Sequence, residues 1–145
     1  MGRRGIAIER DEKPTAGRIV LLVEDEAPLR RVIARNLTQR GHRPIAVDSV
    51  RDAIAEMTAR LPDVVLLDVN LPDGTGWDVL RWLRTIHRKV AVIICSAIPP
   101  SPQMLAEFQP DAVVLKPFSI TVLMQLIATS GIGERPSVSA GEPAT

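Results

Sequence analysis

Five short apolar runs alternate along this chain with stretches of helical periodicity, and no other feature of the sequence constrains the fold as strongly. The runs are rich in Val, Ile and Leu, as is typical of parallel strands that helices cover on both faces. We expect strands at Ile19–Val23, Pro44–Val47, Val64–Asp68, Val90–Ser96 and Ala112–Leu115. The alternation predicts an α/β domain.

Four of the intervening segments carry clear helix signals. Pro28 suits the first turn of a helix, and Gly41 suits the end of the same helix. Ser49 and Ser119 can each cap the helix that follows them. The segment 76–84 has apolar residues at helical spacing.

The segment between Pro99 and Gln109 is different, because its prolines exclude regular helix until about Gln103. We expect a degenerate fourth helix there, of one or two turns. Five strands with such connections predict a doubly wound five-stranded parallel sheet in the flavodoxin-like order 2-1-3-4-5.

Length and composition point to one domain of 145 residues. We expect a flexible lead-in at 1–17, a folded domain at 18–130 and a flexible tail at 131–145, too short for an output domain. A net charge of +1 gives no reason to expect nucleic-acid binding, and no apolar segment is long enough for a membrane span or a secretory signal. We therefore expect a cytoplasmic, apparently stand-alone protein that acts through protein partners.

Polar residues follow the strands at the edge where ligands bind in such sheets. Glu24 and Asp25 follow the first strand, Asp68 ends the third, Ser96 ends the fourth and Lys116 follows the fifth. Three ionised carboxylates would repel one another unless a cation lay between them. A divalent ion such as Mg²⁺ or Mn²⁺, holding a phosphate oxygen as well, relieves that repulsion.

The same residues can carry phosphoryl transfer, which needs a nucleophile in line, a metal and fixed positive charge. Asp68 can attack the phosphorus, Lys116 can neutralise the phosphoryl oxygens, and the Ser96 hydroxyl can donate a hydrogen bond to them.

Four motifs in order resemble the response-regulator receiver family of two-component signalling, of the chemotaxis-regulator type. They occupy residues 20–26, 64–76, 94–97 and 115–118, and the resemblance covers about 18–130. It implies that Asp68 is the phosphoacceptor, with Lys116 and Ser96 on the phosphoryl group. It also implies a metal held directly by Asp25 and Asp68, largely through water by Glu24, and by the backbone carbonyl of Asn70.

The resemblance implies further properties of the chain. A sensor histidine kinase or histidine phosphotransfer protein would donate the phosphoryl group, and an unknown protein would be the target. The chain would not be an enzyme that turns over an external substrate. Formation of a homodimer is compatible with the resemblance. The Lys116–Pro117 bond is expected to be cis.

Two departures from the family concern the output. Val113 stands where receivers usually carry an aromatic switch residue, and the fourth helix is short and rich in proline. We therefore expect altered signalling through the surface of the fourth helix, fifth strand and fifth helix. Ile98, two residues after Ser96, is a candidate shield of the acyl phosphate against water.

Two other functions stay open. The first is a receiver-like binding module that acts independently of phosphorylation. The second is a haloacid-dehalogenase-like phosphatase. Such enzymes use a second carboxylate as acid–base two residues after the nucleophile, where this chain has Asn70.

Several other residues have a structural interpretation that we prefer. We expect a buried thiol at Cys95, a helix-start role for Glu26 and surface positions for His42 and His87. The arginines around the first helix form either a solvated face or a kinase-docking patch: Arg30, Arg31, Arg35, Arg40 and Arg43.

Overall fold

The five apolar runs form one parallel sheet in the computed structural model, which describes residues 17–86 and 89–131. The strands are β1 (Ile19–Val23), β2 (Arg43–Val47), β3 (Val64–Asp68), β6 (Ala91–Ser96) and β7 (Ala112–Leu115). Their spatial order is β2-β1-β3-β6-β7, which is the predicted 2-1-3-4-5 order counted over the long strands. The flavodoxin-like α/β fold is therefore confirmed.

Five helices connect or follow these strands. They are α2 (Ala27–Gln39), α3 (Val50–Ala59), α4 (Gly76–Thr85), α5 (Pro102–Phe108) and α6 (Ile120–Thr129). The predicted caps are present, since the Ser49 side chain accepts a hydrogen bond from the Asp52 N–H and the Ser119 side chain accepts one from the Val122 N–H.

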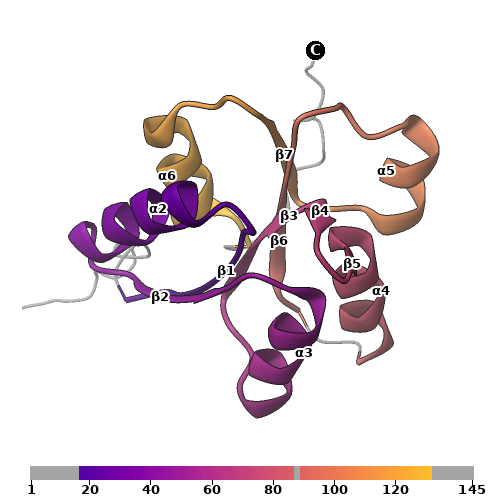
Figure 1. Ribbon diagram of the computed structural model, residues 1–145, viewed down its shortest axis with the longest axis horizontal. Coiled ribbons are helices and arrows are strands. Elements are labelled where there is room, and N and C mark those ends of the chain that lie inside the picture. Colours follow the sequence, from indigo (N-terminus) through magenta and orange to yellow (C-terminus); the bar gives the residue numbers. More distant parts are fainter. Residues whose placement is uncertain (1–16, 87–88, 132–145) are drawn as a thin grey trace, which may run out of the picture.

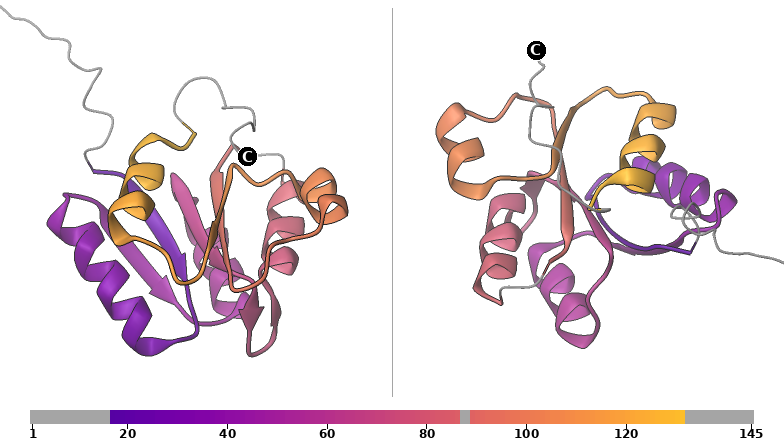
Figure 2. Two further views of the ribbon diagram at one scale, coloured as in Figure 1. Left: turned by 90° about the horizontal axis from the view of Figure 1, so that it is seen from above. Right: turned by 180° about the vertical axis from the view of Figure 1, so that it is seen from behind.

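The core has two halves because successive residues of a strand point to opposite faces of the sheet. Leu21 and Val23 of β1 pack with residues of α3, α4 and α5. Val20 and Leu22 pack with residues of α2 and α6 on the other face. Figures 1 and 2 show α2 and α6 together on one side of the sheet and the other three helices on the opposite side.

Helix α5 is short, with seven residues, as the prolines predict. It begins at Pro102 rather than after it, because proline lacks only an N–H that the first helical turn does not need. Its last residue, Phe108, packs on Trp77 of α4, with ring centroids 5.2 Å apart.

A small antiparallel hairpin follows β3 and was not predicted from the sequence. Its strands are β4 (Asn70–Leu71) and β5 (Gly74–Thr75), and Asn70 pairs with Thr75. The hairpin leads directly into α4, so it connects the carboxyl end of β3 to that helix.

The predicted surface position of His42 is wrong. Its exposed fraction is 5%, and its Nδ1 atom has no hydrogen-bond partner. The residue follows the end of α2, and its N–H donates to the Leu37 carbonyl, which directs the ring inward despite the polar neighbours in sequence. His87 lies outside the described residues, as do nearly all of the predicted ends at 1–17 and 131–145, so those boundaries stay a prediction.

Candidate functional site

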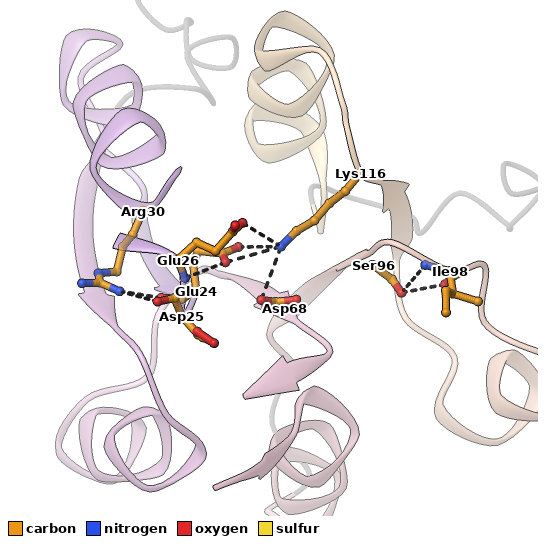
Figure 3. A network of polar contacts seen from close by, with 8 residues as sticks. All are labelled: Glu24, Asp25, Glu26, Arg30, Asp68, Ser96, Ile98 and Lys116. Atoms are coloured by element: carbon orange, nitrogen blue, oxygen red, sulfur yellow. Dashed lines mark hydrogen bonds and ion pairs between the residues drawn. The ribbon is translucent and has the colours of Figure 1, made fainter. Parts of the chain in front are cut away.

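The carboxyl ends of the strands place distant polar residues at one edge of the sheet. Val23 of β1 pairs with Leu67 of β3, so Glu24 and Asp68 each come one residue further along neighbouring strands. On the other side of β3, the ladder continues through β6 to Leu115 of β7, which Lys116 follows. Figure 3 shows the side chains of Glu24, Asp68 and Lys116 pointing toward one another.

Lys116 forms ion pairs with carboxylates from two strand ends. Its Nζ atom lies 3.2 Å from Oε1 of Glu24 and 3.4 Å from Oδ2 of Asp68. Both carboxylate side chains are almost fully buried, with exposed fractions of 3% and 9%. A third carboxylate, from the exposed Glu26, lies 3.9 Å from the same nitrogen. The ammonium group therefore bridges the acidic residues of the site.

The charges at this edge are not balanced. Burial raises the pKa of Glu24, and the neighbouring Asp68 carboxylate raises it further, although the Glu26 N–H and the Lys116 ammonium act in the opposite direction. Burial alone would lower the pKa of Lys116, but the attraction of Asp68 and Glu24 outweighs it and raises that pKa. One ammonium thus leaves the carboxylate repulsion partly uncompensated.

Asp25 lies on the same loop and is exposed. Figure 3 shows its carboxylate directed away from the Lys116 ammonium. No group of three or more His, Cys, Asp or Glu side chains in the described ranges 17–86 and 89–131 is already arranged to hold a metal. The carboxylates of Glu24, Asp25 and Asp68 are nevertheless the hard oxygen donors that Mg²⁺ prefers, and their repulsion is what a divalent ion would relieve.

Ser96 does not contact the acidic residues through its side chain. Its hydroxyl donates a hydrogen bond of 2.6 Å to the Ile98 carbonyl and accepts one of 3.2 Å from the Ile98 N–H. Its backbone carbonyl does accept a hydrogen bond from the Lys116 N–H at 2.8 Å. A role on a phosphoryl group therefore requires the hydroxyl to leave Ile98.

Arg30 supports the acidic loop, a role that the sequence did not reveal. Its guanidinium donates to the backbone carbonyl of Glu24 at 2.8 Å and reaches that of Asp25 at 3.5 Å. Sequence inspection groups Arg30 with the other arginines of α2, because nothing in the sequence says which of them turns back toward the loop.

The loop after Asp68 is packed closely against the strand end. The Gly76 N–H donates to the Val69 carbonyl at 2.8 Å. A Cβ atom at Gly76 would collide with the carbonyl oxygen of Asp68 and lie 3.0 Å from Cγ of Leu67. This close approach requires glycine where α4 begins.

Two other predicted features lie near the site. Val113 is half-buried on β7 and packs against the core, without an aromatic ring at that position. Cys95 is buried as predicted, and burial raises the pKa of its thiol to about 12. Within the described part of the chain, no helix is both long and apolar enough to pass through a lipid bilayer.

Comparison with known proteins agrees with this architecture. Residues 20–128 match the family model for the response regulator receiver domain. The response regulator protein FleR of Pseudomonas aeruginosa is 29% identical over 126 residues, which are 86% of this chain and 27% of FleR. The KDP operon transcriptional regulatory protein KdpE of Escherichia coli is 35% identical over 103 residues, 70% of this chain and 45% of KdpE. The chain thus spans less than half of the length of either relative.

Solved structures show the same fold. A DNA-binding response regulator of the LuxR family from Staphylococcus aureus superposes with a TM-score of 0.70 at 29% identity, covering 76% of this chain and 95% of that one. A CheY-like response regulator receiver domain from Methylobacillus flagellatus gives a TM-score of 0.66 at 25% identity, with coverages of 77% and 99%.

Proposed function

The chain belongs to the response regulator receiver domain family, whose model matches residues 20–128, and from this premise we propose that Asp68 accepts a phosphoryl group. Receiver domains are phosphoacceptor modules of two-component signalling, and they generally depend on Mg²⁺ for phosphorylation. The observation that carries the proposal is the 3.4 Å contact of the Lys116 ammonium with the Asp68 carboxylate at the carboxyl edge of the sheet.

The proposed reaction is an in-line displacement at phosphorus. A carboxylate oxygen of Asp68 forms the new O–P bond while the P–N bond of a phosphohistidine donor breaks, and the imidazole nitrogen keeps the electron pair. Lys116 neutralises charge on the phosphoryl oxygens, since its ammonium already lies beside Asp68. The Ser96 hydroxyl donates to the phosphoryl group after it leaves the Ile98 carbonyl.

The proposed metal ligands are the carboxylates of Asp25 and Asp68, the backbone carbonyl of Asn70 and, largely through water, Glu24. A bound Mg²⁺ or Mn²⁺ supplies positive charge to the phosphoryl oxygens and orients them. Arg30 helps to hold two of these ligands in place, because it binds the backbone of the loop that carries Glu24 and Asp25.

The proposed partners are a sensor histidine kinase or a histidine phosphotransfer protein as donor, and a further protein as target. A doubly charged phosphoryl group would favour the arrangement in which Ser96 and Lys116 both contact it. Phosphorylation then acts as a shift between two populations rather than as turnover of an external substrate.

The test is phosphorylation with a small donor. Wild-type protein incubated with Mg²⁺ and acetyl phosphate should gain the mass of one phosphoryl group, whereas Asp68→Asn should gain none. Replacement of Mg²⁺ by EDTA should abolish the gain in the wild type. An unmodified wild-type mass under these conditions, with beryllofluoride also failing to change the tryptophan emission, would reject the proposal.

A second candidate is a binding module that does not depend on phosphorylation. It is favoured by Val113 at the usual aromatic position and by the Ser96 hydroxyl, which is engaged with Ile98. A partner that binds wild type and Asp68→Asn with equal affinity, with and without acetyl phosphate, would support this alternative.

A further inference from the structure

The carboxylate of Asp73, at the tip of the β4–β5 hairpin, caps a helix that begins 23 residues earlier in the chain. Its Oδ1 atom accepts a hydrogen bond of 2.8 Å from the Val50 N–H, and its Oδ2 atom accepts one of 3.0 Å from the Arg51 N–H. These are the first two residues of α3. The N–H groups of a first helical turn have no partner within their helix, so Asp73 satisfies two of them.

The capping group is charged, and it lies where the helix dipole favours negative charge. The two backbone hydrogen bonds lower the pKa of Asp73, and the one from Arg51 has the larger effect. Ser49 caps the same helix independently, since its hydroxyl accepts from the Asp52 N–H at 3.1 Å. Helix α3 therefore has a local cap of its own, and Asp73 adds a connection between that helix and the hairpin.

The other end of the hairpin is fixed to α4 by a capping box. The Asp78 carboxylate accepts from the Thr75 N–H at 2.9 Å, and the Thr75 hydroxyl accepts from the Asp78 N–H at 3.4 Å. Between the two helix starts there is little space, because a Cβ at Gly74 would lie 2.8 Å from Oδ2 of Asp78 and 3.2 Å from Cγ2 of Val50. The hairpin is thus held by α3 on one side and by α4 on the other.

We propose that Asp73 is a positioning residue for the metal site: by fixing the hairpin to α3, it sets the place of the Asn70 backbone carbonyl. Asn70 opens β4 and pairs with Thr75, so it belongs to the segment that is held at both ends. Without Asp73 the hairpin loses its two hydrogen bonds to α3, so the Asn70 carbonyl has more freedom to shift relative to Asp25 and Asp68. This inference rests on the proposed function, which makes that carbonyl a ligand.

Metal sites lose affinity when the groups that orient their ligands are removed, typically by about tenfold or more. Asp73→Ala should therefore weaken Mg²⁺ binding about tenfold. Asp73→Asn should weaken it less, because the amide oxygen still accepts one of the two hydrogen bonds. Mg²⁺ is titrated in the absence of any phosphoryl donor, by calorimetry and by the emission of Trp77 and Trp82.

Ser49→Ala is the matched control, since it removes the other cap of the same helix without touching the hairpin. Both alanine variants should lower the Tm by similar amounts, but only Asp73→Ala should weaken Mg²⁺ binding. If Asp73→Ala does not fold, Asp73→Asn is compared with Ser49→Ala in the same way.

The outcomes separate this inference from the proposed function. A wild-type chain that binds no Mg²⁺ would reject the proposed function and the inference with it. If the wild type binds Mg²⁺ and the Asp73 variants bind it equally tightly, the inference alone is rejected. Equal weakening in Ser49→Ala would also reject it, because the effect would then come from the start of α3 and not from the hairpin.

Discussion

Nζ of Lys116 lies closer to Oε1 of Glu24, at 3.2 Å, than to Oδ2 of Asp68, at 3.4 Å. The lysine thus contacts two buried carboxylates that repel each other, and its single positive charge offsets part of that repulsion. A divalent cation bound at this edge would reduce the same repulsion between the carboxylates.

Lys116→Met should destabilise the chain by about 3 kcal/mol, because it leaves Glu24 and Asp68 buried without their cation. The same change should strengthen Mg²⁺ binding, since a neighbouring positive charge is removed, and it should slow phosphorylation by acetyl phosphate. Urea unfolding with and without Mg²⁺ measures the first two effects, and Mg²⁺ should restore most of the lost stability.

Lys89→Met is the control for this variant, because Lys89 is exposed and lies before β6, at the opposite edge of the sheet. It should change neither the stability nor the Mg²⁺ affinity appreciably. Weaker Mg²⁺ binding in Lys116→Met would contradict the role assigned to the ammonium group.

Gly76→Ala should destabilise the chain by roughly 1–3 kcal/mol, since the added methyl group collides with the backbone of Asp68. Chemical denaturation gives the free energy of unfolding, and Thr85→Ala, at the last residue of the same helix, should have a much smaller effect. A Gly76→Ala variant as stable as the wild type would show that α4 can move away from β3 at no cost.

His42 should make the chain less stable as the pH falls below its ordinary pKa of 6.5. Burial, together with Arg18 and Arg40, lowers the pKa of His42, so the unfolded chain binds a proton at a higher pH than the folded chain does. The contribution to stability is complete above pH 6.5 and is lost progressively down to the lowered pKa of the folded state.

Unfolding of His42→Leu, measured at a series of pH values, should lack this part of the pH dependence. Arg40→Gln should retain it in reduced form, because losing one repelling charge raises the folded-state pKa of His42 and brings it closer to the unfolded value. A decline of equal slope in His42→Leu would assign the pH dependence to other groups.

Ile98→Glu should shorten the lifetime of the acyl phosphate several-fold, since a carboxylate brings water to a position beside the site. Ile98 has an exposed fraction of 74%, and its backbone is bound by Ser96, so the side chain can change without disturbing the core. Loss of the phosphoryl mass with time, after removal of the donor, measures the rate. Ile98→Leu should behave as the wild type, and an unchanged rate in Ile98→Glu would reject the shielding hypothesis.

The order of the sheet and the edge that carries Glu24, Asp68 and Lys116 could be predicted from the sequence alone. Apolar runs and the caps Ser49 and Ser119 are local signals, and parallel strands joined by helices must bring their carboxyl ends to the same edge. The bounds of β1, β3 and β7 accordingly agree with the prediction to the residue.

Only the tertiary structure decided which polar groups are partners at that edge. Arg30 turns back to the Glu24 carbonyl, Asp73 caps α3 from the hairpin, and Ser96 binds Ile98. Each outcome depends on how whole elements pack, because a side chain takes whichever unsatisfied backbone group the packing brings within about 3 Å. Sequence neighbours do not contain that information, so the sequence could place Glu24, Asp68 and Lys116 at one edge of the sheet but could not predict which groups bind one another there.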